Sequence, residues 1–334
     1  ILAQASLSQA LGAADVTFSS CSTVAMSIKS LIRQAKKDGA VKPTGGDTRV
    51  EAVPIVDEPL GLSSLQTVSS DSLVSGLQHV HLVEEWLPLE AEAVILRNLR
   101  GRPKDFLKLR GKRTARYGGD PGPPFVAEPL PPWLSELCVA VAAALAPDER
   151  GSAEEMLQPN HVLVNHYQPG EGIMPHTDGP AYDPRAAILS LGSAAVFNFW
   201  RDHAHAASSE PPVLSLLLPP RSLLFFSGEA YSAHLHGITD HRYDDLHPGL
   251  ANWTPAARAR WAAALAAAPG GLPEARESTG AWAQHQLDLP APKAAGAAES
   301  EERAQAPAEL LPSSCSLRRE ERYSLTIRRV PPIQ

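Results

Sequence analysis

The segment from Gln158 to Pro184 constrains the fold most, because it reads as two strands joined by a turn. An alternating, β-branched run from Val162 to Tyr167 leads into a turn rich in proline and glycine, and the chain then re-extends into His176-Thr177-Asp178. Residues two apart on a strand point the same way, so His176 and Asp178 would share a face. An imidazole and a carboxylate side by side can supply two ligands of a metal site.

A third ligand is expected on a later strand that folds back beside this hairpin. The runs 213–218 and 222–227 read as strands around a Pro219-Pro220-Arg221 turn, and His236 opens the next strand after a turn at Gly228. Two histidines and an aspartate form the facial triad that holds non-haem Fe(II) with open positions. Five other histidines lie in polar, loop-like surroundings and are interpreted as solvated: His203, His205, His234, His241 and His247.

The C-terminal segment from Arg322 to Arg328 reads as a strand with both arginines on one face. Taken alone, it is typical of an edge strand with its arginines in water. An upstream iron triad favours an inward-facing alternative, because such an iron usually needs an anionic cosubstrate and arginine binds carboxylates bidentately.

In this order, the motifs N-x-Y, H-x-D, H-G and R-x-S-x-T-x-R resemble the AlkB family of Fe(II)/2-oxoglutarate dioxygenases, most of all the branch of its sixth homologue. The resemblance covers about residues 78 to 245 and 316 to 332. It implies a mainly β fold with flanking helices, a double-stranded β-helix or jelly roll. It also implies Fe(II), 2-oxoglutarate and O₂ as cofactors, with succinate, CO₂ and a hydroxylated C–H bond as products.

Matching positions carry the family's roles onto this chain. The resemblance assigns iron to His176, Asp178 and His236, and cosubstrate contacts to Asn165, Tyr167, Arg322, Ser324 and Arg328. Arg322 would hold the distal carboxylate of 2-oxoglutarate with help from Tyr167, while the carboxylates that Asn165 and Arg328 contact stay open. Ser324 stands where the founding AlkB pattern has asparagine, so this shorter donor could loosen or re-aim one contact.

The most basic stretch of the chain holds nine lysines and arginines against Asp105 alone, from Arg97 to Arg116. In the family this region lies over the active site as a substrate lid, and it continues here as a loop from Tyr117. The candidate substrate contacts are Lys112, Arg113, Arg116 and Tyr117, with Tyr182 just past the second ligand. These residues would suit a phosphate backbone and a stacked base. A solvated charged face, and simple packing for Tyr182, are the alternatives.

Three further elements are expected around these motifs. A helix from about Leu89 to Leu99 would be ended by Gly101, and a second helix would begin at Pro131-Pro132-Trp133 and bury Cys138 in an apolar stripe. A buried strand from Ala187 to Trp200 would bend or bulge at Gly192-Ser193.

The sequence predicts a dioxygenase domain over residues 78–334, preceded by a poorly ordered extension and linker over 1–77. A low-complexity insertion at about 246–314, with an alanine-rich helix from Thr254-Pro255, would loop out and add no catalysis. The chain begins without methionine, which suggests a fragment or a processed start. Residues 1–39 are poor in acids but lack an arginine-rich amphipathic start, so organellar targeting stays open.

Composition limits the function classes. The net charge of −7 argues mildly against a purely electrostatic nucleic-acid binder. Three cysteines far apart without a C-x-x-C pair argue against structural zinc and a disulfide framework, and no run of 18 apolar residues is present to span a membrane. Three hypotheses stay open: demethylation of alkylated DNA or RNA, oxidation of a protein side chain, and a non-catalytic binding protein on the same fold. Cytoplasm and nucleus are the expected compartments.

Overall fold

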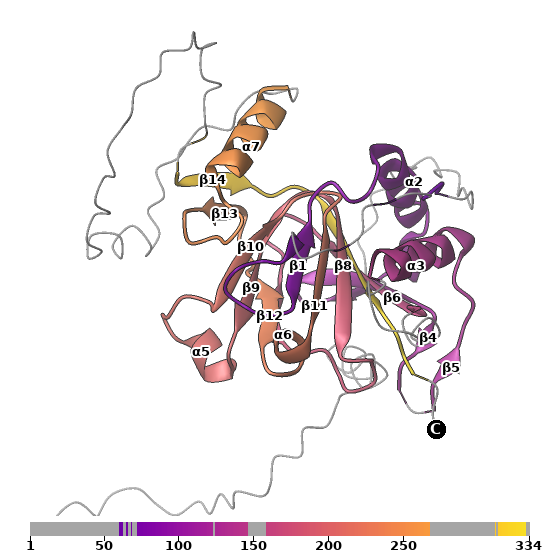
Figure 1. Cartoon of the computed structure of the whole chain (residues 1–334). Helices are drawn as coiled ribbons and strands as arrows, with labels where there is room; N and C mark the ends of the chain where they lie inside the picture. The colour runs from indigo at the N-terminus through magenta and orange to yellow at the C-terminus, as the bar shows by residue number, and fades with distance from the viewer. Residues whose placement is uncertain are drawn as a thin grey trace, which may run out of the picture. The chain divides into compact units, whose positions relative to one another are not determined.

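The structure, a computed structural model, describes residues 60–62, 65, 68, 72–122, 124–145, 158–267, 311 and 313–331 (Figure 1). The candidate targeting segment, most of the predicted linker and most of the predicted insertion lie outside these residues. Among the helices of the described residues, none is both long and apolar enough to cross a membrane.

Two antiparallel sheets form the body of the described domain. The larger sheet has seven strands in the order β1 (Val80–Val83), β11 (Leu223–Ser227), β8 (Arg185–Gly192), β15 (Arg322–Arg328), β6 (His161–Tyr167), β3 (Lys112–Tyr117) and β2 (Leu107–Leu109). The smaller sheet has four strands in the order β10 (Leu214–Leu218), β9 (Ala195–Trp200), β12 (Leu235–Ile238) and β7 (Ile173–His176). This is the expected jelly roll.

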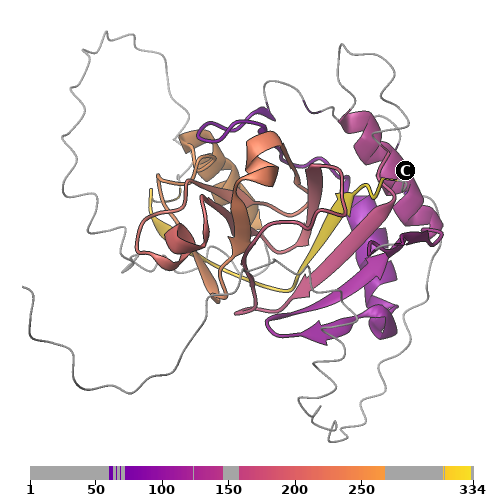
Figure 2. The same cartoon turned by 90° about the horizontal axis from the view of Figure 1, so that it is seen from below.

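The helices α2 (Leu89–Arg100) and α3 (Pro132–Ala144) cover one face of the larger sheet, as Figures 1 and 2 show. The predicted apolar stripe of α3 is confirmed, because Leu134, Leu137, Cys138 and Val141 are all buried there. Pro132 stands at the first helical turn, where its missing N–H costs nothing. A core of Val, Leu and Ile side chains fills the space between these helices and the sheet.

A second core lies between the two sheets, where phenylalanines of β9 and β11 pack together. The expected single strand from Ala187 to Trp200 is instead two strands in different sheets. The chain crosses between β8 and β9 at Gly192, whose φ of +81° suits glycine and whose Cβ position lies 2.6 Å from the Glu321 carbonyl oxygen. The predicted bend was therefore in the right place, but it is a complete change of sheet.

The edge-strand alternative for Arg322–Arg328 is wrong, because β15 pairs with β6 on one side and with β8 on the other. The turn predicted at Gly228 is the short helix α6 (Gly228–Ser232). The loop predicted from Tyr117 contains strand β4 (Gly119–Asp120), which pairs with β5 (Val126–Ala127). The remaining short elements beside them are the 3₁₀ helix η2 (Pro103–Asp105) and α5 (His203–Ala207).

Both ends of the predicted insertion are folded. The strands β13 (Tyr243–Leu246) and β14 (Cys315–Arg318) pair as an antiparallel two-stranded sheet, and α7 (Pro255–Ala267) begins where the sequence predicted a helix. A third core beneath them, with Leu250 and Trp253, covers the outer face of the smaller sheet.

Candidate metal centre

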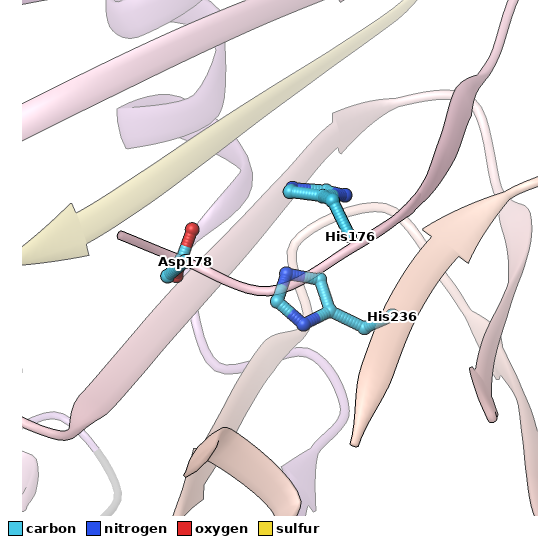
Figure 3. A group of neighbouring side chains, drawn as sticks. All are labelled: His176, Asp178 and His236. Carbon is cyan, nitrogen blue, oxygen red and sulfur yellow. The ribbon is translucent and has the colours of Figure 1, made fainter. Parts of the chain in front are cut away.

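The structure brings the three predicted metal ligands together at the end of the smaller sheet (Figure 3). His176 on β7 and His236 on β12 are direct partners in the antiparallel pairing, which sets their ring centroids 4.5 Å apart. Asp178 lies two residues past β7, and the ligand atoms of all three side chains lie within 4.8 Å of one another. These residues could therefore hold one metal ion.

Hydrogen bonds orient two of these ligands. His176 Nδ1 lies 2.9 Å from the Met174 carbonyl oxygen, which can only accept, so Nδ1 carries the proton and Nε2 keeps a free lone pair. The Arg328 guanidinium donates from Nη1 to Asp178 Oδ1 at 2.5 Å, while Asp178 Oδ2 has no partner among the described residues. Each side chain thus keeps an atom available for a metal.

The surroundings set the charge of the cluster. Burial, together with His176, lowers the pKa of His236 to about 3, and burial also lowers the pKa of His176. Burial alone would raise the pKa of Asp178, but Arg328 and the two histidines outweigh it and lower this pKa. At neutral pH the cluster is two neutral imidazoles and one carboxylate, a donor set that fits non-haem Fe(II).

The larger sheet faces this cluster with the polar sides of β6 and β15. Asn165 and Tyr167 alternate with the core residues of β6, and they pair in register with Ser324 and Arg322 of β15. All four side chains are buried. The predicted cosubstrate residues on these two strands therefore lie next to one another on the face of the sheet opposite the helices, which is called the pocket side below.

Arg322 has the chemistry of an anion site. Its side chain is 3% exposed, and its Nη2 donates to Ser190 Oγ at 2.9 Å, but its Nε and Nη1 have no partner within the described part of the chain. Burial lowers its pKa to about 10, so the group stays charged at neutral pH. A buried cation with two unpaired donors is costly unless an anion binds it, and a carboxylate fits two adjacent N–H groups. The site therefore fits 2-oxoglutarate.

Arg328, unlike Arg322, already has a carboxylate partner. Besides its pairing with Asp178, its guanidinium carbon stacks 3.8 Å from the centre of the Tyr182 ring. Tyr182 in turn contacts His161, with ring centroids 5.4 Å apart. The structure thus shows Arg328 holding the candidate metal ligand, and it shows Tyr182 packed over Arg328.

The predicted substrate residues of the basic stretch divide between the two faces of β3. Lys112 and Arg116 are on the pocket side. Burial and then Arg328 lower the pKa of Lys112 to about 8, and Arg116 pairs with Asp120 at 3.1 Å.

Arg113 and Tyr117 point to the helix layer instead. There the Tyr117 hydroxyl donates to Asp105 at 3.0 Å, and its ring lies 6.3 Å from that of Trp133. Arg113 acts on the pKa of His166, which stacks on Tyr323 on the same side of the sheet. The predicted lid thus runs from the end of α2 through η2 to the edge hairpin β2–β3 of the larger sheet, and two of the four candidates in this hairpin and its end, Lys112 and Arg116, lie on the face opposite the helices.

Three residues differ from the sequence interpretation or were missed by it. His205 was interpreted as solvated, which is wrong because it is buried in α5 with its Nε2 2.9 Å from the Pro211 carbonyl oxygen. His161 is fully buried on the pocket side of β6, and its two-residue phase with Asn165 could have revealed it. Arg319 is buried beside the cosubstrate region, but it lies in a run of charged residues, so the sequence gave no sign of its burial.

Comparison with known proteins gives a family model and a solved structure that are similar to this chain. The model of the 2OG-Fe(II) oxygenase superfamily matches residues 96–328. The solved structure of OsALKBH1 shares 14% identity and a TM-score of 0.40, over 75% of this chain and 98% of that one.

Two curated relatives are similar in sequence. The probable RNA/DNA demethylase ALKBH6 of Danio rerio is 35% identical over 167 residues, which are 48% of this chain and 68% of the fish protein. The tRNA (carboxymethyluridine(34)-5-O)-methyltransferase alkbh8 of Xenopus tropicalis is 30% identical over 187 residues, 54% of this chain but only 28% of that protein. By the family model and the fish relative, the chain belongs to the 2OG-Fe(II) oxygenase superfamily and, within it, to the AlkB family.

Proposed function

We propose that this oxygenase removes methyl groups from alkylated DNA or RNA, with His176, Asp178 and His236 as its iron ligands. The observation that carries the proposal is the presence of two complementary sites on the two sheets. The His-Asp-His cluster, two neutral imidazoles and one carboxylate, lies at the end of the smaller sheet, and the buried Arg322, whose Nε and Nη1 have no partner among the described residues, lies on the larger sheet. This arrangement suits iron and a dicarboxylate held side by side.

The chain's own residues position the reactants. Arg322 binds the distal carboxylate of 2-oxoglutarate beside Tyr167, and Asn165 Oδ1 is unpartnered within the described residues near it. Arg328 fixes the Asp178 carboxylate, and the rings of Phe197, Phe199 and Phe226 keep water from His236. Bound iron supplies the activation of O₂ that is coupled to decarboxylation of 2-oxoglutarate and to hydroxylation of a C–H bond.

The nucleic-acid substrate is supported by the relatives and by charge. The fish relative is named as an RNA/DNA demethylase, and the frog relative as a tRNA methyltransferase. Lys112 and Arg116 add two cations on the pocket side, where a phosphate could bind. A hydroxylated N-methyl group decomposes to formaldehyde and the demethylated base.

Formaldehyde release tests the substrate class. Purified protein with Fe(II), 2-oxoglutarate and O₂ would be given N-methylated single-stranded DNA, double-stranded DNA, RNA or a protein extract. We expect release from an oligonucleotide, with binding that weakens steeply as salt rises. Arg116→Gln should weaken oligonucleotide binding more than the matched variant Lys104→Gln, because Lys104 is exposed in η2 on the helix side.

Other outcomes would redirect the proposal. Stimulation of turnover by the extract alone would move the substrate to proteins, and the absence of turnover despite bound iron would favour a binding protein on this fold. We propose the nucleus and cytoplasm as the compartments, because the substrates of the proposal are found there; cell fractionation checks this.

A further inference from the structure

A second buried arginine lies close to the cosubstrate region. Arg319 stands between β14 and β15, three residues before Arg322, and its side chain is 5% exposed. Its Nε donates to Asp244 Oδ2 at 2.7 Å, and its Nη2 donates to Asp244 Oδ1 at 2.5 Å. Both oxygens of this carboxylate are therefore held by one guanidinium.

The rest of Arg319 is anchored to the strand of a metal ligand. Its Nη1 donates to the carbonyl oxygen of Thr239, the residue that follows β12 and its His236. Its backbone N–H donates to the Arg242 carbonyl oxygen at 3.0 Å. The guanidinium is thus fixed in one orientation, with Asp244 of β13 on its forked side.

The two charges of this pair act on Arg322. After burial and Tyr167, the groups that act on the pKa of Arg322 are Arg319, which lowers it, and Asp244, which raises it. Burial raises the pKa of Tyr167 to about 12, and Arg322 and Arg319 both oppose that rise. Arg322, whose guanidinium carbon lies 5.7 Å from the centre of the Tyr167 ring, is thus buried within reach of the charges of Arg319 and Asp244.

Such a carboxylate is a competitor for any dicarboxylate that binds Arg322. A buried, unpaired Asp244 would be stabilised by pairing with a nearby cation, since an isolated buried charge is costly. In the structure Asp244 pairs with Arg319, and Arg322 keeps its Nε and Nη1 without a partner in the described part of the chain. Asp244 neutralises the charge of Arg319, whereas no carboxylate in the described part of the chain pairs with Arg322.

We infer that Arg319 is a positioning residue that engages Asp244 and so keeps Arg322 free for the cosubstrate carboxylate. The inference rests on the proposed function, in which Arg322 binds 2-oxoglutarate. The donor nitrogens of Arg319 are engaged by Asp244 and Thr239. Arg319 acts through Asp244, so its loss should be repaired by removing the charge of Asp244.

The test is calorimetric binding of 2-oxoglutarate to Mn(II)-loaded protein without O₂, with KM, kcat and thermal unfolding measured beside it. Arg319→Gln should raise the Kd and the KM for 2-oxoglutarate about tenfold or more, and lower kcat at saturation much less. The double variant Arg319→Gln/Asp244→Asn should return the Kd close to that of the wild type, and Arg319→Lys should restore it in part. Arg318→Gln is the matched control, because Arg318 is two-thirds exposed and pairs with Glu320 at the surface.

Two results would overturn the inference: a wild-type Kd in Arg319→Gln, or a Kd still weak in the double variant. If Arg319→Gln does not fold, the double variant decides alone, since it leaves no unpaired buried charge. Arg322→Ala separates this question from the proposed function. Normal binding in Arg322→Ala contradicts the cosubstrate site itself, whereas lost binding there with normal binding in Arg319→Gln contradicts only the role of Arg319.

Discussion

Arg322 gives the sharpest prediction at the scale of single residues. Arg322→Ala removes the unpaired donors, so the affinity for 2-oxoglutarate should fall by about 2 kcal/mol or more, while the affinity for iron changes little. Calorimetry with each ligand in turn measures both. Arg201→Ala is the control, because Arg201 forms an exposed ion pair with Glu210. A larger loss for iron than for 2-oxoglutarate would show that the cosubstrate has been misplaced.

The buried imidazole of His161 should make the stability of the folded protein depend on pH. Burial, followed by Arg328 and Arg116, lowers its pKa from 6.5 to about 3 in the folded protein. The unfolded chain therefore binds a proton that the folded chain does not, and stability is lost as the pH falls from about 6.5 towards 3. As the pH falls through this window, the free energy of unfolding should decrease less steeply in His161→Gln than in the wild type. The two slopes should differ by up to about 1.4 kcal/mol per pH unit. Denaturant titrations at several pH values measure the slope, and equal slopes would contradict the assignment.

At this scale the sequence predicted which side chains share a face of a strand, but not every residue that they contact. The two-residue alternation correctly put Arg322 and Ser324 on one face of β15, and Asn165 and Tyr167 on one face of β6, but it did not predict that these strands pair. It could not reveal that Arg328 pairs with Asp178, because that contact joins residues 150 positions apart. Nor could it separate the buried Arg319 from the exposed Arg318 beside it.

At the scale of elements, the crossing between β8 and β9 depends on Gly192. Gly192→Ala places a Cβ against the Glu321 carbonyl oxygen at a positive φ, so it should destabilise the fold by roughly 1–3 kcal/mol. Thermal or denaturant unfolding measures the loss. Gly122→Ala is the matched control, since a Cβ there meets only the Asp120 side chain at 3.5 Å, and it should be close to neutral. Equal stability of the two variants would contradict this account of the crossing.

Sheet membership explains where predictions of elements fell short. Ala187 to Trp200 is buried on both faces except at Gly192, so hydrophobic periodicity could not show that it divides between two sheets. The basic stretch from Arg97 to Arg116 was expected over the active site, but it runs from the end of α2 through η2 and β2 and only its last residues lie in β3, where neighbouring side chains point to opposite faces. Charge counting alone carries no information about the face of a strand.

At the scale of the whole molecule, residues 270–309 should be dispensable for the reaction. The strand pair β13–β14 and the Arg319–Asp244 ion pair join residues that precede this segment in the sequence to residues that follow it. Leu311 accepts from Arg258 in the first turn of α7, so a linker must return along the length of this helix, about 14 Å. Replacing 270–309 by roughly ten flexible residues should keep the unfolding temperature and kcat near those of the full chain. A large loss of kcat in a stable variant would assign catalysis to the insertion.

The jelly roll itself came from the resemblance to a family, and the sheets of the structure agree with it. The order of motifs along the chain carried that prediction, because the ligands must converge from strands distant in sequence. The motifs could not predict the residues that surround each ligand, such as the phenylalanines around His236 or the arginine that pairs with Asp178.

The central claim is that the His-Asp-His cluster is the iron site of a 2-oxoglutarate oxygenase. The measurement that tests it most directly is succinate formation from 2-oxoglutarate with Fe(II) and O₂, compared between the wild type and His176→Ala. Turnover should be lost in the variant while its free energy of unfolding stays within about 1 kcal/mol, because His176 is only partly buried. His203→Ala, at an exposed histidine, should turn over normally. Wild-type succinate formation in His176→Ala would contradict the claim.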